Sequence, residues 1–232
     1  MQRIFTVFAA VAVAFAATAE EPQAGKLRLR TVLHDPLRGQ AELYVRDAGG
    51  SLVPLYLARE GLSEAQLVSL NEKALELYKS PEIDPENPLE QLAARVAVPK
   101  GVSRGIVLIV PSGKETGPAY RMMLINDDPK VFKKGESRVL NLTSLSMAMK
   151  AGEHSGKLPP AAMTPIPPVK ERNDLNQAQT SFYQKGESED EWLLVAERPM
   201  QFTDTVRNII LIYGMPNSKM PRLRTLIDTE LR

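Results

Sequence analysis

The sequence has 232 residues, with 29 lysines and arginines against 28 aspartates and glutamates, and a net charge of +1. A chain this close to neutral, with its charges scattered, lacks the basic surface expected of a protein whose main partner is nucleic acid or an anionic membrane. Because it has no cysteine, its hydrophobic core must hold the fold without disulfides.

Residues 1–19 have the three-part pattern of a secretory signal peptide. Arg3 supplies a positive charge, residues 4–16 form an uncharged apolar run, and Ala17 and Ala19 are the small residues that a signal peptidase reads. The run is too short to span ~30 Å of hydrocarbon comfortably, and no later apolar stretch is long enough. We therefore expect an exported protein, periplasmic, surface-bound or secreted, without an integral membrane segment after cleavage.

The chain that follows begins with strands. Residues 27–33 and 41–46 alternate apolar and polar side chains, and residues 47–50 form a glycine-rich turn. Residues 52–57 are then the expected return strand of a hairpin.

One short helix is predicted, starting at Ser63. The segment Ser63-Glu64-Ala65-Gln66 places serine at the N-cap and glutamine at N3, which is the capping-box pattern. We expect this helix to end near Asn71. Residues 74–78 predict a strand, and closely spaced prolines exclude regular structure from the acidic loop at residues 80–87.

The middle of the chain is the densest β region. Residues 106–110 are an unbroken apolar run, which is typical of a strand buried on both faces at the centre of a sheet. Further strands are predicted on either side of this run. They span residues 92–98, 120–125, 137–142 and 145–149.

Residues 158–169 contain five prolines. Since proline is confined to strand edges, turns and extended connections, we expect this segment to run extended across the surface or along a sheet edge. We interpret it as a crossover between strands of a single domain at residues 20–232. The alternative is a subdivision near residues 158–173.

Four strands are predicted after the Pro-rich segment. They span residues 178–184, 192–196, 209–213 and 223–227. Arginines flank these strands, and such side chains either ring a pocket or, more commonly, cover sheet edges. They are Arg198, Arg207, Arg222 and Arg224.

This succession of short strands predicts an all-β fold, an antiparallel β-sandwich with one short helix and a Pro-rich crossover. Full-length helices alternating with strands, which would indicate a parallel α/β sheet, are not predicted. No internal repeat at a fixed period is evident in the sequence.

One segment matches a catalytic motif. Gly101-Val102-Ser103-Arg104-Gly105 has the G-x-S-x-G spacing of a nucleophile elbow, which requires a strand before it and a helix after it. Strands are predicted on both sides, so we interpret the segment as a hairpin turn and do not expect Ser103 to be catalytic.

Metal and cofactor sites are not expected. The sequence has two histidines, His34 and His154, whereas a zinc site draws three or four ligands from His, Cys and carboxylates. The carboxylates of loop 80–87 lack the Asp-x-Asp-x-Asp-Gly spacing that would identify a calcium loop.

The remaining candidates for a polar site are four side chains in turns. Asp127 and Asp128 end a predicted strand, and Glu153 and His154 lie in a polar turn. Carboxylates that meet across a cleft would suit a hydrolase. The simpler interpretation is solvated loop side chains, and we predict neither a catalytic residue nor a metal ligand among them.

Several segments of the second half of the sequence carry a family resemblance. They are residues 134–142, the Pro-rich crossover, Trp192, residues 207–212 and the closing Leu226-Ile227-Asp228. Together they resemble exported immunoglobulin-like β-sandwich proteins of planctomycete and verrucomicrobial bacteria. Some of those proteins are associated with surface pili, so the resemblance implies an immunoglobulin-like fold and an envelope or adhesion role, without catalytic residues.

We therefore predict a non-enzymatic exported protein of the bacterial envelope that binds or scaffolds a protein or another envelope component. An unpaired edge strand or the Pro-rich segment would serve as the docking surface. Two alternatives stay open. One is a hydrolase of envelope polymer that uses carboxylates such as Asp127, Asp128 or Glu153, and the other is a periplasmic chaperone for pilus-like subunits.

Overall fold

The computed structural model describes residues 25–34, 42–113, 116–186, 188, 191–215, 218 and 220–229. The signal peptide predicted at residues 1–19, with Ala17 and Ala19 at its cleavage site, lies outside these residues. Within them the fold is all-β, with sixteen strands and no helix. The described part of the chain thus has no helix with the length and apolar character needed to cross a membrane.

The strands are short and follow one another closely. In chain order they are β1 (Lys26–Leu33), β2 (Tyr44–Arg46), β3 (Leu52–Pro54), β4 (Gln66–Ser69), β5 (Ala74–Tyr78), β6 (Leu92–Ala97), β7 (Arg104–Pro111), β8 (Tyr120–Asn126), β9 (Ser137–Asn141), β10 (Met147–Ala151), β11 (His154–Leu158), β12 (Ala162–Ile166), β13 (Gln177–Lys185), β14 (Trp192–Gln201), β15 (Arg207–Tyr213) and β16 (Arg222–Asp228).

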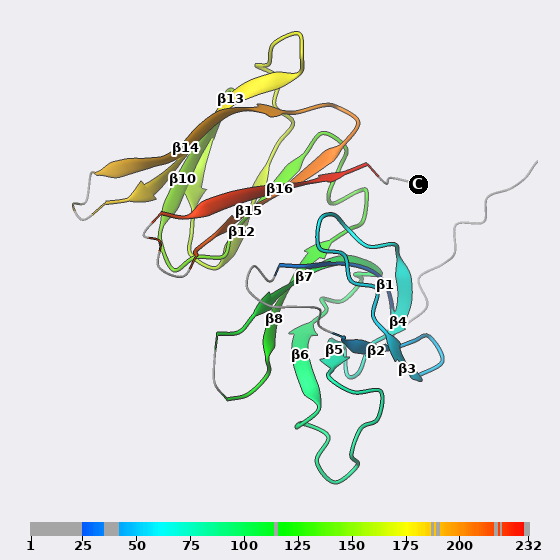
Figure 1. The fold of residues 1–232 in the computed structure, drawn as a ribbon. Helices are drawn as coiled ribbons and strands as arrows, with labels where there is room; N and C mark the ends of the chain where they lie inside the picture. Colours follow the sequence, from blue (N-terminus) through cyan, green and yellow to red (C-terminus); the bar gives the residue numbers. More distant parts are fainter. Residues whose placement is uncertain are drawn as a thin grey trace, which may run out of the picture.

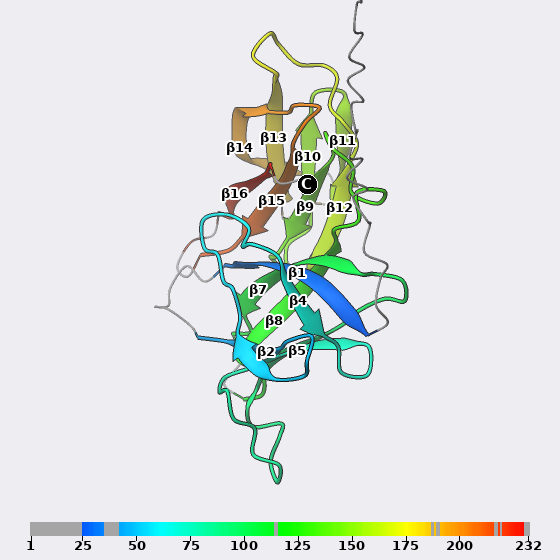
Figure 2. The ribbon, with the colours of Figure 1, turned by 90° about the vertical axis from the view of Figure 1, so that its right-hand side faces the viewer.

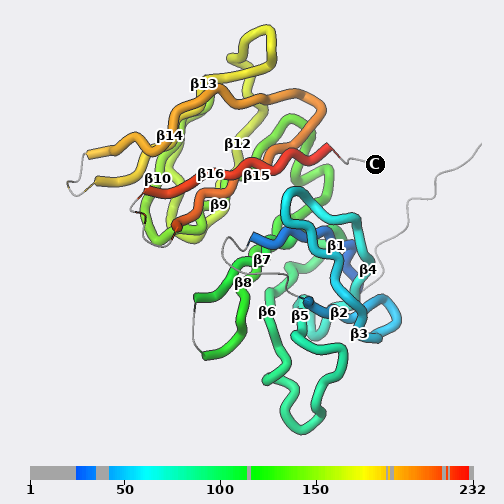
Figure 3. The backbone as a smooth tube through the Cα atoms, in the orientation of Figure 1, coloured from blue at the N-terminus to red at the C-terminus, as the bar shows by residue number. Residues whose placement is uncertain are grey.

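The strands form four sheets of four strands each, in two halves (Figure 1). The first half, β1 to β8, holds the sheets β4-β1-β7-β8 and β3-β2-β5-β6, and the second half, β9 to β16, holds β12-β9-β15-β16 and β11-β10-β13-β14. The chain completes the first half before it enters the second (Figure 3). The structure therefore confirms the all-β prediction and is consistent with a β-sandwich.

The two halves repeat one topology. Adding eight to each strand number of the first half gives the strand orders of the second half. In both, the first strand pairs in parallel with the seventh, as β1 with β7 and β9 with β15, so the sheets are not wholly antiparallel. The sequences of β7, RGIVLIVP, and β15, RNIILIY, carry the same pattern. The repeat has no fixed period in the sequence, because its short strands are separated by loops of unequal length.

Each half has a hydrophobic core of its own. The first core includes Leu27 and Leu75, and the second includes Phe182 and Ile210, all of them fully buried. Burying a large apolar side chain contributes about 1.5–3 kcal/mol relative to leaving it exposed. The two cores therefore stabilise the halves separately.

A third hydrophobic cluster joins the halves. It lies between the sheets β4-β1-β7-β8 and β12-β9-β15-β16 and includes Ile106 and Leu108 of β7 and Leu211 of β15, and the views in Figures 1 and 2 place these sheets next to each other. Val107 of β7 points the other way, into the first core. The prediction that the apolar run of β7 is buried on both faces is therefore confirmed.

The chain passes from one half to the other between β8 and β9, at residues 127–136. The Pro-rich segment lies inside the second half, where β12 pairs with β9 as an edge strand that contains Pro165. This confirms an extended segment at a sheet edge. The separate cores would suit two domains, whereas the third cluster joins the halves as a single domain would. The single domain at residues 20–232 therefore stays a prediction.

The short helix predicted from Ser63 does not form. Residues Gln66–Ser69 are β4, which pairs antiparallel with β1. The Ser63 hydroxyl accepts the amide of Thr31 at 2.9 Å, and the Ser63 amide donates to the Thr31 carbonyl at 2.9 Å. Pairing with β1 therefore uses the groups that would have capped the helix, and a helix this short is marginal without tertiary support.

The segment Gly101–Gly105 is not a hairpin turn as predicted. It links β6 and β7, which belong to facing sheets of the first half. Its last residues, Arg104 and Gly105, begin β7 rather than a helix. The strand-to-helix geometry of a nucleophile elbow is therefore not present at Ser103.

Candidate functional site

The repeat places charged residues at equivalent positions between the halves. Arg104 begins β7 and Arg207 begins β15. The amide of Asp127 donates to the Arg104 carbonyl at 3.0 Å, and Asp228 is opposite Arg207 in the β15–β16 register. Arg104 therefore corresponds to Arg207, and Asp127 corresponds to Asp228.

Four of the charged side chains form a buried network, which we call the ion quartet. Its members are Arg30, Asp127, Arg207 and Asp228, exposed by 4%, 2%, 0% and 2%. Arg30 donates to Asp127 at 3.0 and 3.1 Å and to Asp228 at 2.8 Å through two nitrogens. Arg207 donates to Asp127 at 2.6 Å and to Asp228 at 2.9 Å, with a second short bond to Asp228. Each arginine therefore bridges both aspartates, one from each half.

The charges of the ion quartet cancel, which makes their burial tolerable. Burial by itself raises the pKa of Asp228, but hydrogen bonds and charge from Arg30 and Arg207 outweigh it and leave that pKa below its usual range. Burial likewise opposes the charge of Arg30, whereas its bonds to Asp228 and Asp127 raise its pKa. Both shifts favour the charged forms of Arg30 and Asp228, which therefore form an ion pair at neutral pH.

Phe132 anchors the quartet to the third cluster. Its ring is fully buried between the guanidinium carbons of Arg207 and Arg138, at 4.4 and 4.5 Å from the ring centroid. Its carbonyl accepts a hydrogen bond from Arg207 at 3.0 Å. Arg207 thus has a partner for its guanidinium on every side, with cation–π contact to the ring in addition.

A polar cleft opens over one side of the quartet, with a volume of about 490 Å³. Arg30 and Asp127 of the quartet line it. Its other polar lining residues are Arg28, Glu64, Arg104 and Thr229. We call it the arginine cleft. Its size lies within the ~300–1,000 Å³ typical of small-molecule sites.

Two arginines of the cleft lie side by side, and neither is paired with Glu64 or Asp127, the carboxylates that also line it. Arg28 and Arg104 are direct partners in the parallel β1–β7 register, so their side chains leave the same face of the sheet. Neither side chain forms an ion pair within the described part of the chain, and Arg104 Nε is buried without a hydrogen-bond partner. Its counterpart Arg207 is saturated by two aspartates. The cleft therefore offers unused donors that suit an anion.

The four residues of the predicted polar cluster occupy two separate places. Asp127 belongs to the ion quartet. Asp128 lies in the following turn, where its carboxylate accepts the amide of Lys130 at 2.8 Å. Glu153 and His154 lie at the β10–β11 turn. Within the described residues, Asp127 and Asp128 share no contact residue with Glu153 and His154, so the four side chains do not form one site.

Glu153 and His154 hold the β10–β11 turn against the Pro-rich crossover. The Glu153 carboxylate accepts the amides of Lys170 at 2.7 Å and Glu171 at 2.9 Å, and His154 Nε2 lies 3.2 Å from the Pro168 carbonyl. Gly152 has φ +51, and a Cβ there would lie 2.9 Å from the Glu171 carbonyl oxygen. The arrangement is therefore a structural clamp.

This clamp leads to a pH-dependent prediction for Glu153. Hydrogen bonds from the backbone amides of Glu171, Glu153 itself and Lys170 lower its pKa from 4.5 to about 2. A depressed pKa contributes stability above the unfolded value and loses it as the pH falls through the folded value. In urea unfolding, the gap in midpoint between the wild type and Glu153→Gln should be constant above pH 4.5 and shrink towards pH 2. Glu171→Gln, whose own carboxylate is not part of the clamp, should show no such trend.

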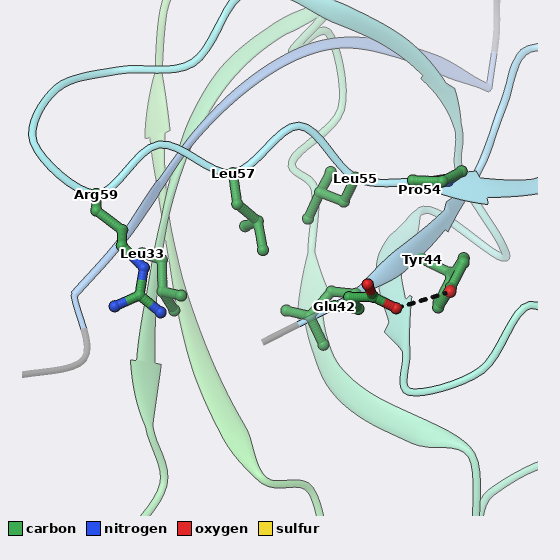
Figure 4. Close-up of a pocket in the computed structure, with 8 residues that line it drawn as sticks. Leu33, Glu42, Tyr44, Pro54, Leu55, Leu57 and Arg59 are labelled. Atoms are coloured by element: carbon green, nitrogen blue, oxygen red, sulfur yellow. Dashed lines mark hydrogen bonds between the residues drawn. The ribbon is translucent and has the colours of Figure 1, made fainter. Parts of the chain in front are cut away.

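A second pocket, of about 320 Å³, is lined by residues of the first half (Figure 4). Leu33, Leu55 and Leu57 line it, and Leu33 and Leu55 also belong to the first core. Its charged lining residues, Glu42 and Arg59, have opposite signs. Unlike the arginine cleft, it therefore has no excess charge and no convergent set of donors.

Sequence reasoning missed Arg28, Arg30 and Arg104 as site residues, because basic residues alternating with leucine usually mark a solvated strand face. A better signal was available at β7 and β15. In each, an arginine directly precedes a strand that is apolar on both faces. A charge in that position must be buried with a partner or face a cleft.

A comparison of the sequence with protein-family models and with curated proteins finds no match. The fold and the cleft define a class only, which is an all-β protein of two topologically repeated halves with a cationic cleft between them.

Proposed function

We propose that this chain is a non-enzymatic, exported binding protein of the bacterial envelope, and that the arginine cleft holds an anionic ligand. The observation that carries the proposal is the adjacent pair Arg28 and Arg104, which has no carboxylate partner among the described residues and whose Arg104 Nε is buried and unpaired there. A buried donor without a partner costs about 1–3 kcal/mol, and an oxyanion would remove that cost.

Export and the immunoglobulin-like class belong to the same proposal. Export is supported by the signal pattern at residues 1–19. The immunoglobulin-like class is supported by the packing of two four-stranded sheets in each half. Association with a surface structure such as a pilus would fit a ligand that is part of the envelope.

A binding role suits the cleft better than hydrolysis. A carboxylate pair that works as acid and base needs one member that holds a proton. Asp127 and Asp228 instead each accept hydrogen bonds from two arginines. Asp127 lines the cleft, and the two aspartates together keep Arg30 and Arg207 in place.

The proposal is tested by titrating the protein with inorganic phosphate, sulfate and citrate at low salt, using calorimetry. We expect binding to at least one of them, and we expect Arg104→Ala to weaken it about 10- to 100-fold, since a hydrogen bond to a charged group contributes about 1.5–3 kcal/mol. Arg28→Ala should weaken binding as well, and added salt should weaken it further.

Arg121→Ala is the matched control, because Arg121 is an exposed arginine of β8 that does not line the cleft. It should bind the anions as the wild type does. Binding that survives the Arg28→Ala/Arg104→Ala double change, or no binding of any of the three anions, contradicts the proposal.

A further inference from the structure

The two halves close differently along one side. In the first half, β6 and β8 are edge strands of facing sheets and contact each other. Their counterparts in the second half are the edge strands β14 and β16, which lie on the same side of that half in Figure 2. Among the described strands, β14 is in substantial contact with β13 and β16 with β15. The second half therefore has an open seam where the first half is closed.

Most other sheet edges are protected. Prolines lie in the edge strands β3, β12 and β14, as Pro54, Pro165 and Pro199. The edge strands β4, β6, β8 and β11 each contact a strand of the facing sheet. Proline and contact with a neighbour both prevent an edge from pairing with another chain. Among the described edge strands, β16 has neither protection.

The open seam contains a groove of about 390 Å³. Leu223, Thr225 and Ile227 of β16 line one wall, and Ile227 is 56% exposed. The hydroxyl oxygen of Thr225 is buried and has no hydrogen-bond partner in the described part of the chain. An apolar side chain left in water and a buried hydroxyl left unsatisfied are both unfavourable, and an added strand would relieve both.

The opposite wall is positively charged. Arg198 and Met200 of β14 line the groove, and since they are two residues apart their side chains lie on the same face of the strand. Met200 is buried in the second core, so that face is the inner one. Arg198 forms no ion pair in the part of the chain that the structure describes. An acidic side chain entering the seam would therefore find a partner.

We propose that β16 is the docking edge for an extended segment of a partner protein, which adds a fifth strand to the sheet β12-β9-β15-β16. The backbone of the segment pairs with β16, its apolar side chains cover the groove, and an inward acidic side chain meets Arg198. In the first half the edge strands β6 and β8 contact each other and close the sandwich on this side. In the second half the added strand would close the gap between β14 and β16 in the same way. This surface is separate from the arginine cleft and does not depend on an anion there.

The test uses the full chain with a tethered strand. A short Gly-Ser linker after Arg232 leads into alternating valine and threonine, with one glutamate placed at each inward position in turn. The expected result is that amide exchange of β16 slows at least about tenfold for one glutamate position. A lysine in the same position should abolish this protection, and Arg198→Glu should reverse the preference so that the lysine strand protects.

Three results would overturn the proposal. One is unchanged exchange in β16 with every tethered strand. Another is equal slowing of β16 amide exchange by the glutamate and lysine strands, which would show that Arg198 does not select an acidic partner. The third is concentration-dependent dimerisation of the unmodified chain with protection of β16, which would identify the occupant as a second copy of this chain.

Discussion

Replacing Asp228 with asparagine should destabilise the protein by about 3–5 kcal/mol, the typical cost of breaking a buried ion pair by changing one partner. The change leaves Arg30 and Arg207 buried with one carboxylate between them. Both arginines are almost fully buried, so water cannot replace the lost charge. Urea unfolding followed by tryptophan fluorescence measures the effect as a lower midpoint at an unchanged slope.

Glu72→Gln is the control for this experiment. Glu72 lies 3.7 Å from Arg95 in an ion pair whose glutamate side chain is 82% exposed, and such surface pairs contribute about 0–1 kcal/mol. The midpoint should therefore barely move. A loss below about 1 kcal/mol for Asp228→Asn would mean that the quartet is solvated, contrary to its burial.

Replacing Phe132 with alanine should cost a similar amount, about 3–5 kcal/mol. Phe132 is fully buried in the third cluster, so the change creates a cavity between the halves. It also removes the ring that contacts Arg138 and Arg207. Because this cluster joins the halves, we expect calorimetry to show the two halves beginning to unfold separately, as a broadened or double transition.

Two neighbouring changes bracket this result. Phe132→Leu keeps much of the volume and should cost less than Phe132→Ala. Val131→Ala removes methyl groups from a side chain that is 51% exposed and should change stability by less than about 0.5 kcal/mol. A small effect of Phe132→Ala would show that the contact between the halves does not limit stability.

Strand positions could be predicted well from the sequence where a strand buries either one face or both faces. The apolar run of β7 and the alternation in β1 identified both strands, since their periodicity reports directly on which faces are buried. The helix at Ser63 was wrong because local capping preference is weak, and pairing of Gln66–Ser69 with β1 outweighs it. The strand β11 was missed because the glycine and polar residues of its sequence, HSGKL, indicated a turn.

The site was harder to predict than the strands, because its residues are far apart in the chain. Asp127 was noticed as a strand end, but nothing local indicates that it meets Arg30 and Arg207. Arg104 was noticed only as part of a motif around Ser103. Its importance appears when it is compared with Arg207, its counterpart in the repeat, and that comparison requires the strand register.

The ion quartet also has a consequence for the order in which the chain folds. Arg30 lies in the first described strand and Asp228 in the last, 198 positions apart. Because synthesis proceeds from the N-terminus, Arg30 and the face of β7 that lies in the third cluster lack their partners in β15 and β16 until those strands have emerged. Each half can form its own core from its own strands, but the contact between the halves is complete only when β16, the last described strand, is in place.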